Sequence, residues 1–136
     1  MNKRFGLGLA MVGMIVVGAA TTQTLSAQQQ AIKRTVLQKT DLTGITSREG
    51  VMIQGEIPPG AESGRHVHPG TELGYLLEGA LVLEVEGSAP MTLNAGSSWT
   101  VDASKVHNAR NIGDSLAKTL VVYVVEKGKP LASPAP

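Results

Sequence analysis

The chain has 136 residues, of which 12 are Lys or Arg and 11 are Asp or Glu, and it contains no cysteine. This nearly neutral charge, without any basic run, argues against binding to nucleic acid or to an acidic membrane surface. The absence of cysteine excludes disulfides, a thiol nucleophile and thiolate metal ligands.

The first 27 residues are predicted to be a secretory signal peptide. Lys3 and Arg4 form a short basic region, and residues 5–20 are free of charge and mainly apolar. This run is shorter than the about 20 residues that a membrane-spanning helix needs. The small and polar residues that follow, up to Ala27, are typical of a cleavage region. An uncleaved membrane anchor is the alternative.

Cleavage after Ala27 would leave a chain with one acidic residue in excess. Removing Lys3 and Arg4 lowers the number of basic residues from 12 to ten, against 11 acidic ones. We expect this mature protein in the periplasm or outside the cell, without stable insertion in a membrane.

The rest of the chain predicts short strands. Residues 28–46 are expected to form an N-terminal arm with one short strand at 35–37. In residues 51–57, the alternation of Val51, Ile53 and Ile57 with other residues indicates a half-buried strand. Further strands are predicted at 73–77, 81–86, 91–93, 98–101, 107–111 and 119–125, with Leu81, Leu83 and Val85 facing inwards. Residues 128–136 contain three prolines and are expected to be a loose tail.

This pattern predicts an all-β fold. Many short strands separated by Gly and Pro turns are typical of a sandwich or barrel, and no stretch has a helical period. Closing the sheet into a small barrel removes edge strands that could otherwise aggregate. No internal repeat is evident, so we expect a single barrel domain over residues 47–127.

The three histidines and one carboxylate are the candidate metal ligands. His66 and His68 are two residues apart, so in an extended strand their side chains point to the same face and could bind one ion. The Pro69-Gly70 pair after them would end the strand and allow Glu72 to turn back towards the same point. His107, far downstream, would supply the fourth ligand.

The region around these residues resembles the cupins. The first cupin motif, G-x5-H-x-H-x3,4-E-x6-G, is met in full by Gly60, His66, His68, Glu72 and Gly79. The second, G-x5-P-x-G-x2-H-x3-N, is met at Gly96, His107 and Asn111, whereas Asp102 replaces its proline and Ser104 its second glycine. The two departing residues shape a turn and bind no metal, so the ligand set stays intact. The resemblance covers roughly residues 50–125.

The resemblance implies a double-stranded β-helix, or jelly-roll barrel, with the ligands inside its mouth. It leaves a homodimer open. Asn111 is expected to have a structural role, holding a backbone group near His107, and Arg65 to lie at the surface. Met52, Leu76, Leu83 and Trp99 are expected to form an apolar wall beside the metal.

One divalent ion is predicted, and its identity stays open among Fe, Mn, Ni, Zn and Cu. Relative affinity would favour copper or zinc. Four protein ligands leave one or two positions on an ion that accepts five or six, and these could take water, dioxygen or a substrate. No other catalytic constellation is present in the sequence.

Two classes of function follow. The first is a metal-dependent enzyme, either dioxygenase-like as the resemblance suggests or an isomerase, that acts on a small oxygenated substrate. In it Glu72 is the candidate catalytic residue as well as a ligand. The second is a non-catalytic module of the cell envelope that binds a metal or a small ligand. The fold does not decide between them.

Processing of the N-terminus gives the first testable prediction. The exported protein should begin at or near Gln28, because the uncharged run ends before a cleavage region. Mass spectrometry of the intact protein from the exported fraction measures this directly. Retention of residues 1–27 would contradict cleavage and favour a membrane anchor.

Overall fold

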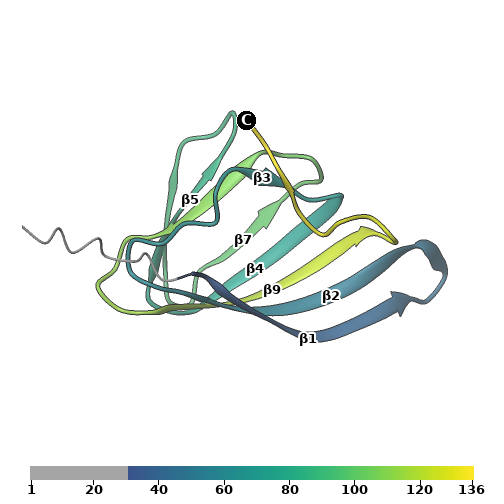
Figure 1. Cartoon of the computed structure of the whole chain (residues 1–136), viewed down its shortest axis with the longest axis horizontal. Helices are drawn as coiled ribbons and strands as arrows, with labels where there is room; N and C mark the ends of the chain where they lie inside the picture. Colours follow the sequence, from purple (N-terminus) through teal and green to yellow (C-terminus); the bar gives the residue numbers. More distant parts are fainter. Residues whose placement is uncertain (1–30) are drawn as a thin grey trace, which may run out of the picture.

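The computed structural model describes residues 31–136, which form two five-stranded antiparallel sheets facing each other (Figure 1). The first sheet has the order β1-β2-β9-β4-β7, with strands at Lys33–Leu42, Ile45–Ile57, Ala117–Glu126, Gly70–Glu78 and Ser98–Val101. The second has the order β10-β3-β8-β5-β6, with strands at Ser133–Pro134, His66–Val67, His107–Asn111, Ala80–Val85 and Met91–Asn94. The predicted all-β class is therefore confirmed. The predicted signal peptide lies outside the described residues.

The core lies between the two sheets and follows the predicted alternation. Val51, Ile53 and Ile57 of β2 are buried, as are Leu81 and Leu83 of β5 from the opposite sheet. Each such side chain contributes roughly 1.5–3 kcal/mol when it leaves water. This apolar layer holds the sheets together.

Residues 31–136 include no helix that is long and apolar enough to cross a membrane.

The N-terminal strand is longer than predicted. Instead of a short strand at 35–37, β1 runs from Lys33 to Leu42 and pairs with β2 along its length, with a turn at Gly44 (φ 79°). Nearly all of β1 is exposed. The sequence pattern missed most of this strand because a strand without a buried face lacks the alternation that marks the others.

The C-terminal tail differs from the loose segment that the sequence predicts. Ser133 and Pro134 form β10, which pairs with β3, and the amide of Ala135 donates to the carbonyl of Arg65 at 3.0 Å. Proline is tolerated here because β10 is the edge strand of its sheet. The tail therefore lies beside the strand that carries His66 (Figure 1).

Ser104 occupies the position where the second cupin motif has glycine. Its φ is 62°, in the left-handed region, and its amide donates to the carbonyl of His68 at 3.0 Å. A serine pays a steric cost there that glycine avoids, on the order of 1 kcal/mol or more. The loop thus keeps the glycine-type backbone despite the substitution, and it links β8, which begins at His107, to the His68 segment by a hydrogen bond.

Candidate metal centre

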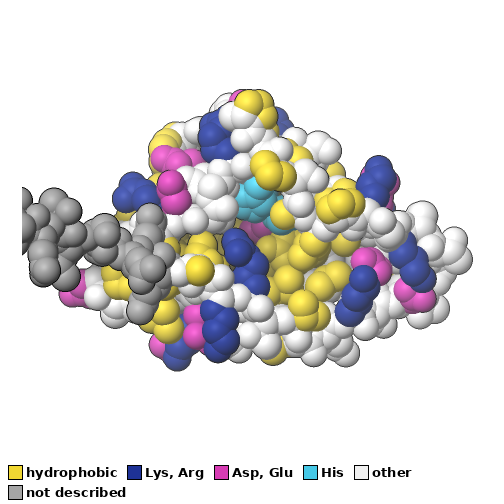
Figure 2. Space-filling model, viewed as in Figure 1, with side chains coloured by type: hydrophobic (Ala, Val, Ile, Leu, Met, Phe, Trp, Pro, Cys, Tyr) yellow, Lys and Arg dark blue, Asp and Glu magenta, His cyan; other side chains and the backbone are white. Residues whose placement is uncertain are grey.

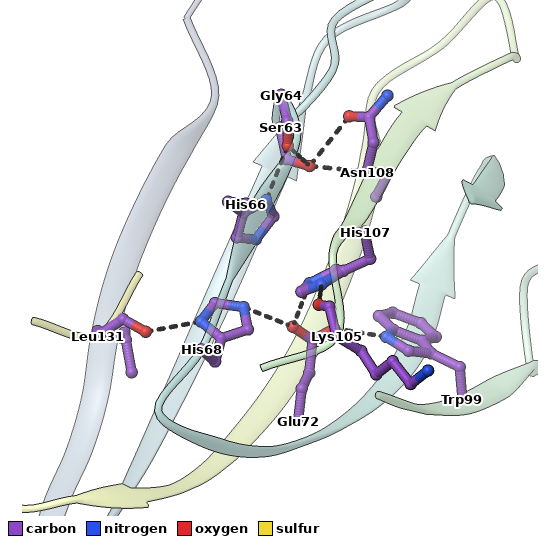
Figure 3. Close-up of polar contacts among 11 residues, drawn as sticks. Ser63, Gly64, His66, His68, Glu72, Trp99, Lys105, His107, Asn108 and Leu131 are labelled. Carbon is purple, nitrogen blue, oxygen red and sulfur yellow. Dashed lines mark hydrogen bonds and ion pairs between the residues drawn. The ribbon is translucent and has the colours of Figure 1, made fainter. Parts of the chain in front are cut away.

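The four predicted ligands converge from both sheets (Figure 3). His66 in β3 is the direct cross-strand partner of His107 in β8. His68 follows β3, and Glu72 stands in β4 of the other sheet. The break between β3 and β4 at residues 68–69 matches the predicted turn, which brings Glu72 back towards the histidines. One candidate ligand atom from each of the four residues lies within 4.8 Å of the others.

The three imidazole rings lie close together, and two of them face the carboxylate. Ring centroids are 4.8 Å apart for His66 and His68, and 4.2 Å apart for His66 and His107. The Nε2 atoms of His68 and His107 lie 3.0 and 3.4 Å from Oε2 of Glu72. These distances are short enough for one ion to bind all of the donor atoms.

Backbone carbonyls fix the orientation of all three imidazoles. Nδ1 of His66 lies 2.7 Å from the carbonyl of Gly64, Nδ1 of His68 lies 2.6 Å from that of Leu131, and Nδ1 of His107 lies 2.9 Å from that of Lys105. A carbonyl can only accept a hydrogen bond, so each Nδ1 carries the proton and donates. Each Nε2 is thereby left available as a ligand, which is how the outer shell of a metal site sets the histidine tautomer.

The burial of these atoms tests whether the residues fit a metal. His68 and His107 are each 3% exposed and Glu72 is 5% exposed. The Nε2 atoms of His68 and His107 find no hydrogen-bond partner within residues 31–136. A buried lone pair that faces a carboxylate oxygen is unfavourable unless a proton or a cation lies between them. The donor set therefore fits a divalent ion.

Without an ion, protons must satisfy this cluster. Burial lowers the pKa of His66, as do the two neighbouring histidines. Burial also acts to lower the pKa of His107, but hydrogen bonds to Glu72 and to the Lys105 carbonyl outweigh it and raise that pKa. Burial alone would raise the pKa of Glu72, but the hydrogen bonds that His107 and His68 donate when they are protonated, together with the bond from Trp99, hold it well below its ordinary value. The carboxylate is therefore ionised at neutral pH and ready to bind a cation.

Two aromatic residues complete the centre, and sequence reasoning assigned neither of them a polar role. Trp99 Nε1 donates to Oε1 of Glu72 at 2.6 Å, which directs the other oxygen, Oε2, towards the histidines. The Tyr123 ring packs 4.6 Å from that of His68. A glycine inside a strand was the available signal: a Cβ at Gly74 would lie 2.0 Å from Cε2 of Trp99, so glycine makes room for the indole.

An apolar cavity of about 60 Å³ adjoins the centre. The sequence predicted an apolar wall of four residues beside the metal, and only Trp99 of these lines the cavity. Met52, Leu76 and Leu83 do not line it, so this part of the prediction is wrong. Leu76 and Leu83 are instead fully buried in the core, and Met52 is half-buried. The hydrophobic residues that do line it are Ile32, Ile53, Ile57, Leu81, Trp99, Ala109, Val121 and Tyr123.

Asn111 and Arg65 were expected to lie outside the ligand set. The buried Asn111 amide donates to the carbonyls of Ile57 and Ser115 and accepts from the amide of Gly113. Asn111 therefore has the expected structural role. The backbone groups that it binds lie not near His107, where they were expected, but at the end of β2 and in the loop between β8 and β9. Arg65 is exposed, as expected, and donates to the carbonyl of Pro136 at 2.7 Å.

Residues 54–123 match the family model of the Cupin domain, Cupin_2. No curated protein sequence matches the chain. Among solved structures, an uncharacterised protein with a double-stranded β-helix domain from Klebsiella pneumoniae is 22% identical, with a TM-score of 0.61 and coverage of 77% of this chain and 84% of that one. This likeness identifies the fold as the predicted jelly roll.

Two similar structures are of enzymes. An oxalate oxidase in complex with the substrate analogue glycolate is 22% identical over 64% of this chain and 52% of its own, with a TM-score of 0.55. A DMSP lyase from Ruegeria pomeroyi is 20% identical over 76% of this chain and 51% of its own, with a TM-score of 0.62. This chain thus spans about half the length of these enzymes, and the likeness shows a common fold.

The hydrogen bond from Trp99 to Glu72 gives a prediction about stability and pH. Trp99→Phe should lower the free energy of unfolding of the metal-free protein by about 2 kcal/mol at pH 7, because a buried carboxylate loses a donor. Since the folded-state pKa of Glu72 lies below the unfolded value, its ionised form stabilises the fold above that value and stops doing so as pH falls through the folded pKa. The variant raises the folded pKa, so it should unfold at a higher pH on acidification.

Denaturant titrations followed by circular dichroism from pH 7 downwards measure this effect. The controls are the single variant Glu72→Gln and the double variant Glu72→Gln/Trp99→Phe. Once the charge of Glu72 is gone, Trp99→Phe should lower the free energy of unfolding by less than it does in wild type. Equal acid midpoints for Trp99→Phe and wild type would show that the bond does not hold the carboxylate ionised.

Proposed function

The chain belongs to the Cupin domain family, and from that premise we propose that it binds one divalent metal ion and acts as a dioxygenase-like enzyme on a small oxygenated substrate. One observation carries the proposal: His66, His68, Glu72 and His107 offer ligand atoms within 4.8 Å of one another. In this assignment the three Nε2 atoms and Oε2 of Glu72 hold the ion.

The donor set limits the choice of metal without fixing it. Three neutral imidazoles and one carboxylate suit Fe, Mn, Ni, Zn or Cu, and intrinsic affinity rises towards copper. When bound, the ion would polarise a substrate oxygen and offer open positions to substrate or dioxygen. The protein's part is to fix the ligands, which the three carbonyl-bound Nδ1 atoms do.

Glu72 would serve first as a ligand and then in proton transfer. Trp99 holds Oε1 while Oε2 faces the histidines, so the carboxylate has one oxygen for the ion and one beside it. Its low pKa makes it a weak base while these contacts last. Proton uptake by Glu72 would therefore follow displacement of the carboxylate when substrate binds.

The cavity favours a small substrate that contacts mainly apolar walls. Its walls are largely aliphatic, and about 60 Å³ corresponds to about four to six water-sized positions. Excluding water strengthens every electrostatic interaction at the centre. The fold is also used by enzymes named as an oxalate oxidase and a DMSP lyase, which supports catalysis as a use of such a site.

A non-catalytic module that binds a metal or a small ligand is the second candidate. Apart from the ligands, the titratable groups that line the cavity are Arg34 and Tyr123. Burial and the charge of Glu72 raise the pKa of Tyr123, so its phenol stays protonated and can donate but not abstract a proton. Among the cavity-lining residues that are not assigned as ligands, none offers a base at neutral pH, so these groups also fit a module that binds without turnover.

We propose an exported location for this function. The support is the basic and then apolar composition of residues 1–27, followed by a cleavage region. The partner is then a small molecule of the periplasm or of the surroundings, and neither nucleic acid nor a stable membrane insertion is part of the proposal. A homodimer is compatible with it.

The ligand assignment is tested by metal content. His66→Ala, His68→Ala and His107→Ala should each lower the bound metal sharply, because each removes one of four bonds. Elemental analysis of protein refolded with Mn(II) or Fe(II) measures this, with Lys105→Ala as the matched control, since its carbonyl still holds His107. Equal metal content in His107→Ala and wild type would contradict the assignment.

The choice between enzyme and module is tested at Glu72. Glu72→Gln keeps an oxygen near the ion but removes charge and basicity, so it should retain some metal and lose turnover by orders of magnitude. The assay screens diols, thiols and keto acids with the iron, manganese and nickel forms for oxygen uptake and product. Ligand binding without turnover in every form would contradict the enzyme and support the module.

A further inference from the structure

Three residues that are paired across neighbouring strands, one of them an arginine, line the cavity. Arg34 in β1 is the cross-strand partner of Gly55 in β2, which is the partner of Thr119 in β9. Direct partners in antiparallel strands share a face of the sheet, and all three residues line the cavity beside the metal centre. A Cβ at Gly55 would lie 2.5 Å from Oγ1 of Thr119, so the glycine leaves room for the Thr119 side chain.

Arg34 stands where the cavity meets an outer groove. The groove has a volume of about 460 Å³ and is bordered on one side by residues 131–134 of the tail. Arg34, His66 and Tyr123 are among the residues that line both spaces. Figure 2 shows histidine at the floor of this hollow, bordered by hydrophobic and basic side chains. The guanidinium therefore borders both spaces.

The charge of Arg34 is not neutralised by a neighbouring side chain. The other basic residues of β1 form ion pairs, Lys33 with Glu56 at 3.1 Å and Lys39 with Glu49 at 3.0 Å. Within the described chain no ion pair joins Arg34 to a carboxylate, and Glu72 is the one acidic residue lining the cavity or the groove. Glu72 is already engaged by Trp99, His68 and His107.

With a divalent metal bound, the centre and Arg34 together carry a net positive charge, which favours binding of an anion. A divalent ion, ionised Glu72 and neutral histidines leave one positive charge, and Arg34 adds a second. A guanidinium binds a carboxylate through two parallel hydrogen bonds. Arg34 is exposed, so water weakens the attraction, and the planar fork of the guanidinium supplies the selectivity.

We propose that Arg34 selects a small carboxylate with a second oxygen, such as a 2-hydroxy or 2-keto acid, as the ligand of the metal centre, an inference that rests on the proposed function. The carboxylate pairs with the guanidinium, and the second oxygen is free to reach the open position of the ion. The cavity volume of about 60 Å³ limits the ligand to a few non-hydrogen atoms.

The test uses glycolate as the probe and glycolamide as its neutral isostere. Wild type, Arg34→Met, Arg34→Lys and Lys33→Met are loaded with Mn(II), their metal content is measured, and each is titrated with both compounds by calorimetry. Lys33→Met is the matched control, because it removes the same charge from the same strand at a residue paired with Glu56 outside the cavity.

Wild type and Lys33→Met should bind glycolate at least tenfold more tightly than glycolamide. Arg34→Met should keep its metal and bind glycolate about 10- to 100-fold more weakly, with Arg34→Lys in between because it lacks the planar fork. If Arg34→Met fails to fold or to hold metal, a loss of about tenfold in Arg34→Lys carries the same conclusion.

Metal-loaded wild type that binds no glycolate, or that binds both compounds equally, would overturn the inference while leaving the metal centre in place. So would unchanged glycolate binding in the Arg34 variants. Wild-type protein that takes up no metal would instead overturn the proposed function, and this inference with it.

Discussion

A buried carboxylate is the constraint on which the rest of the site depends. Glu72 lies between the two sheets with 5% of its surface exposed, where an isolated charge would cost several kcal/mol. Trp99 donates to one oxygen and the histidines surround the other. The compensation is incomplete while His68 and His107 are neutral, because their protons are on Nδ1 and their Nε2 atoms face the carboxylate with nothing to donate. A cation at this point would satisfy all of these groups together.

The supporting structure keeps this cluster in place by means of backbone groups. The three carbonyls that accept from the Nδ1 atoms belong to the loop before β3, the loop before β8 and the C-terminal tail. The tail is tied down in turn by the pairing of β10 with β3. The imidazole rings are therefore oriented mainly by main-chain hydrogen bonds, from segments whose sequence does not reveal this role. One of these segments, the loop before β8, keeps a left-handed backbone at Ser104 even though serine stands there in place of glycine.

The sequence was informative where chemistry is encoded by local spacing. His66, His68 and Glu72 are recognisable because they are close along the chain, and His107 because its motif repeats a known spacing. The alternation in β2 and β5 predicted the core correctly. The roles of Trp99, Tyr123 and Arg34 depend on cross-strand register, which pairs residues far apart in sequence. Apart from Gly74, which lies opposite Trp99, no local pattern points to them. The same holds for the exposed strand β1 and the proline-containing tail, which lack a buried face to mark them.

Anomalous diffraction from crystals of the purified protein, recorded at the absorption edge of the metal found in it, tests the central claim most directly. The account predicts one peak about 2.0–2.2 Å from Nε2 of His66, His68 and His107 and from Oε2 of Glu72, with each Nδ1 still bonded to its carbonyl. A site without a peak in metal-replete protein, with Glu72 bonded only to protonated histidines and Trp99, would contradict it.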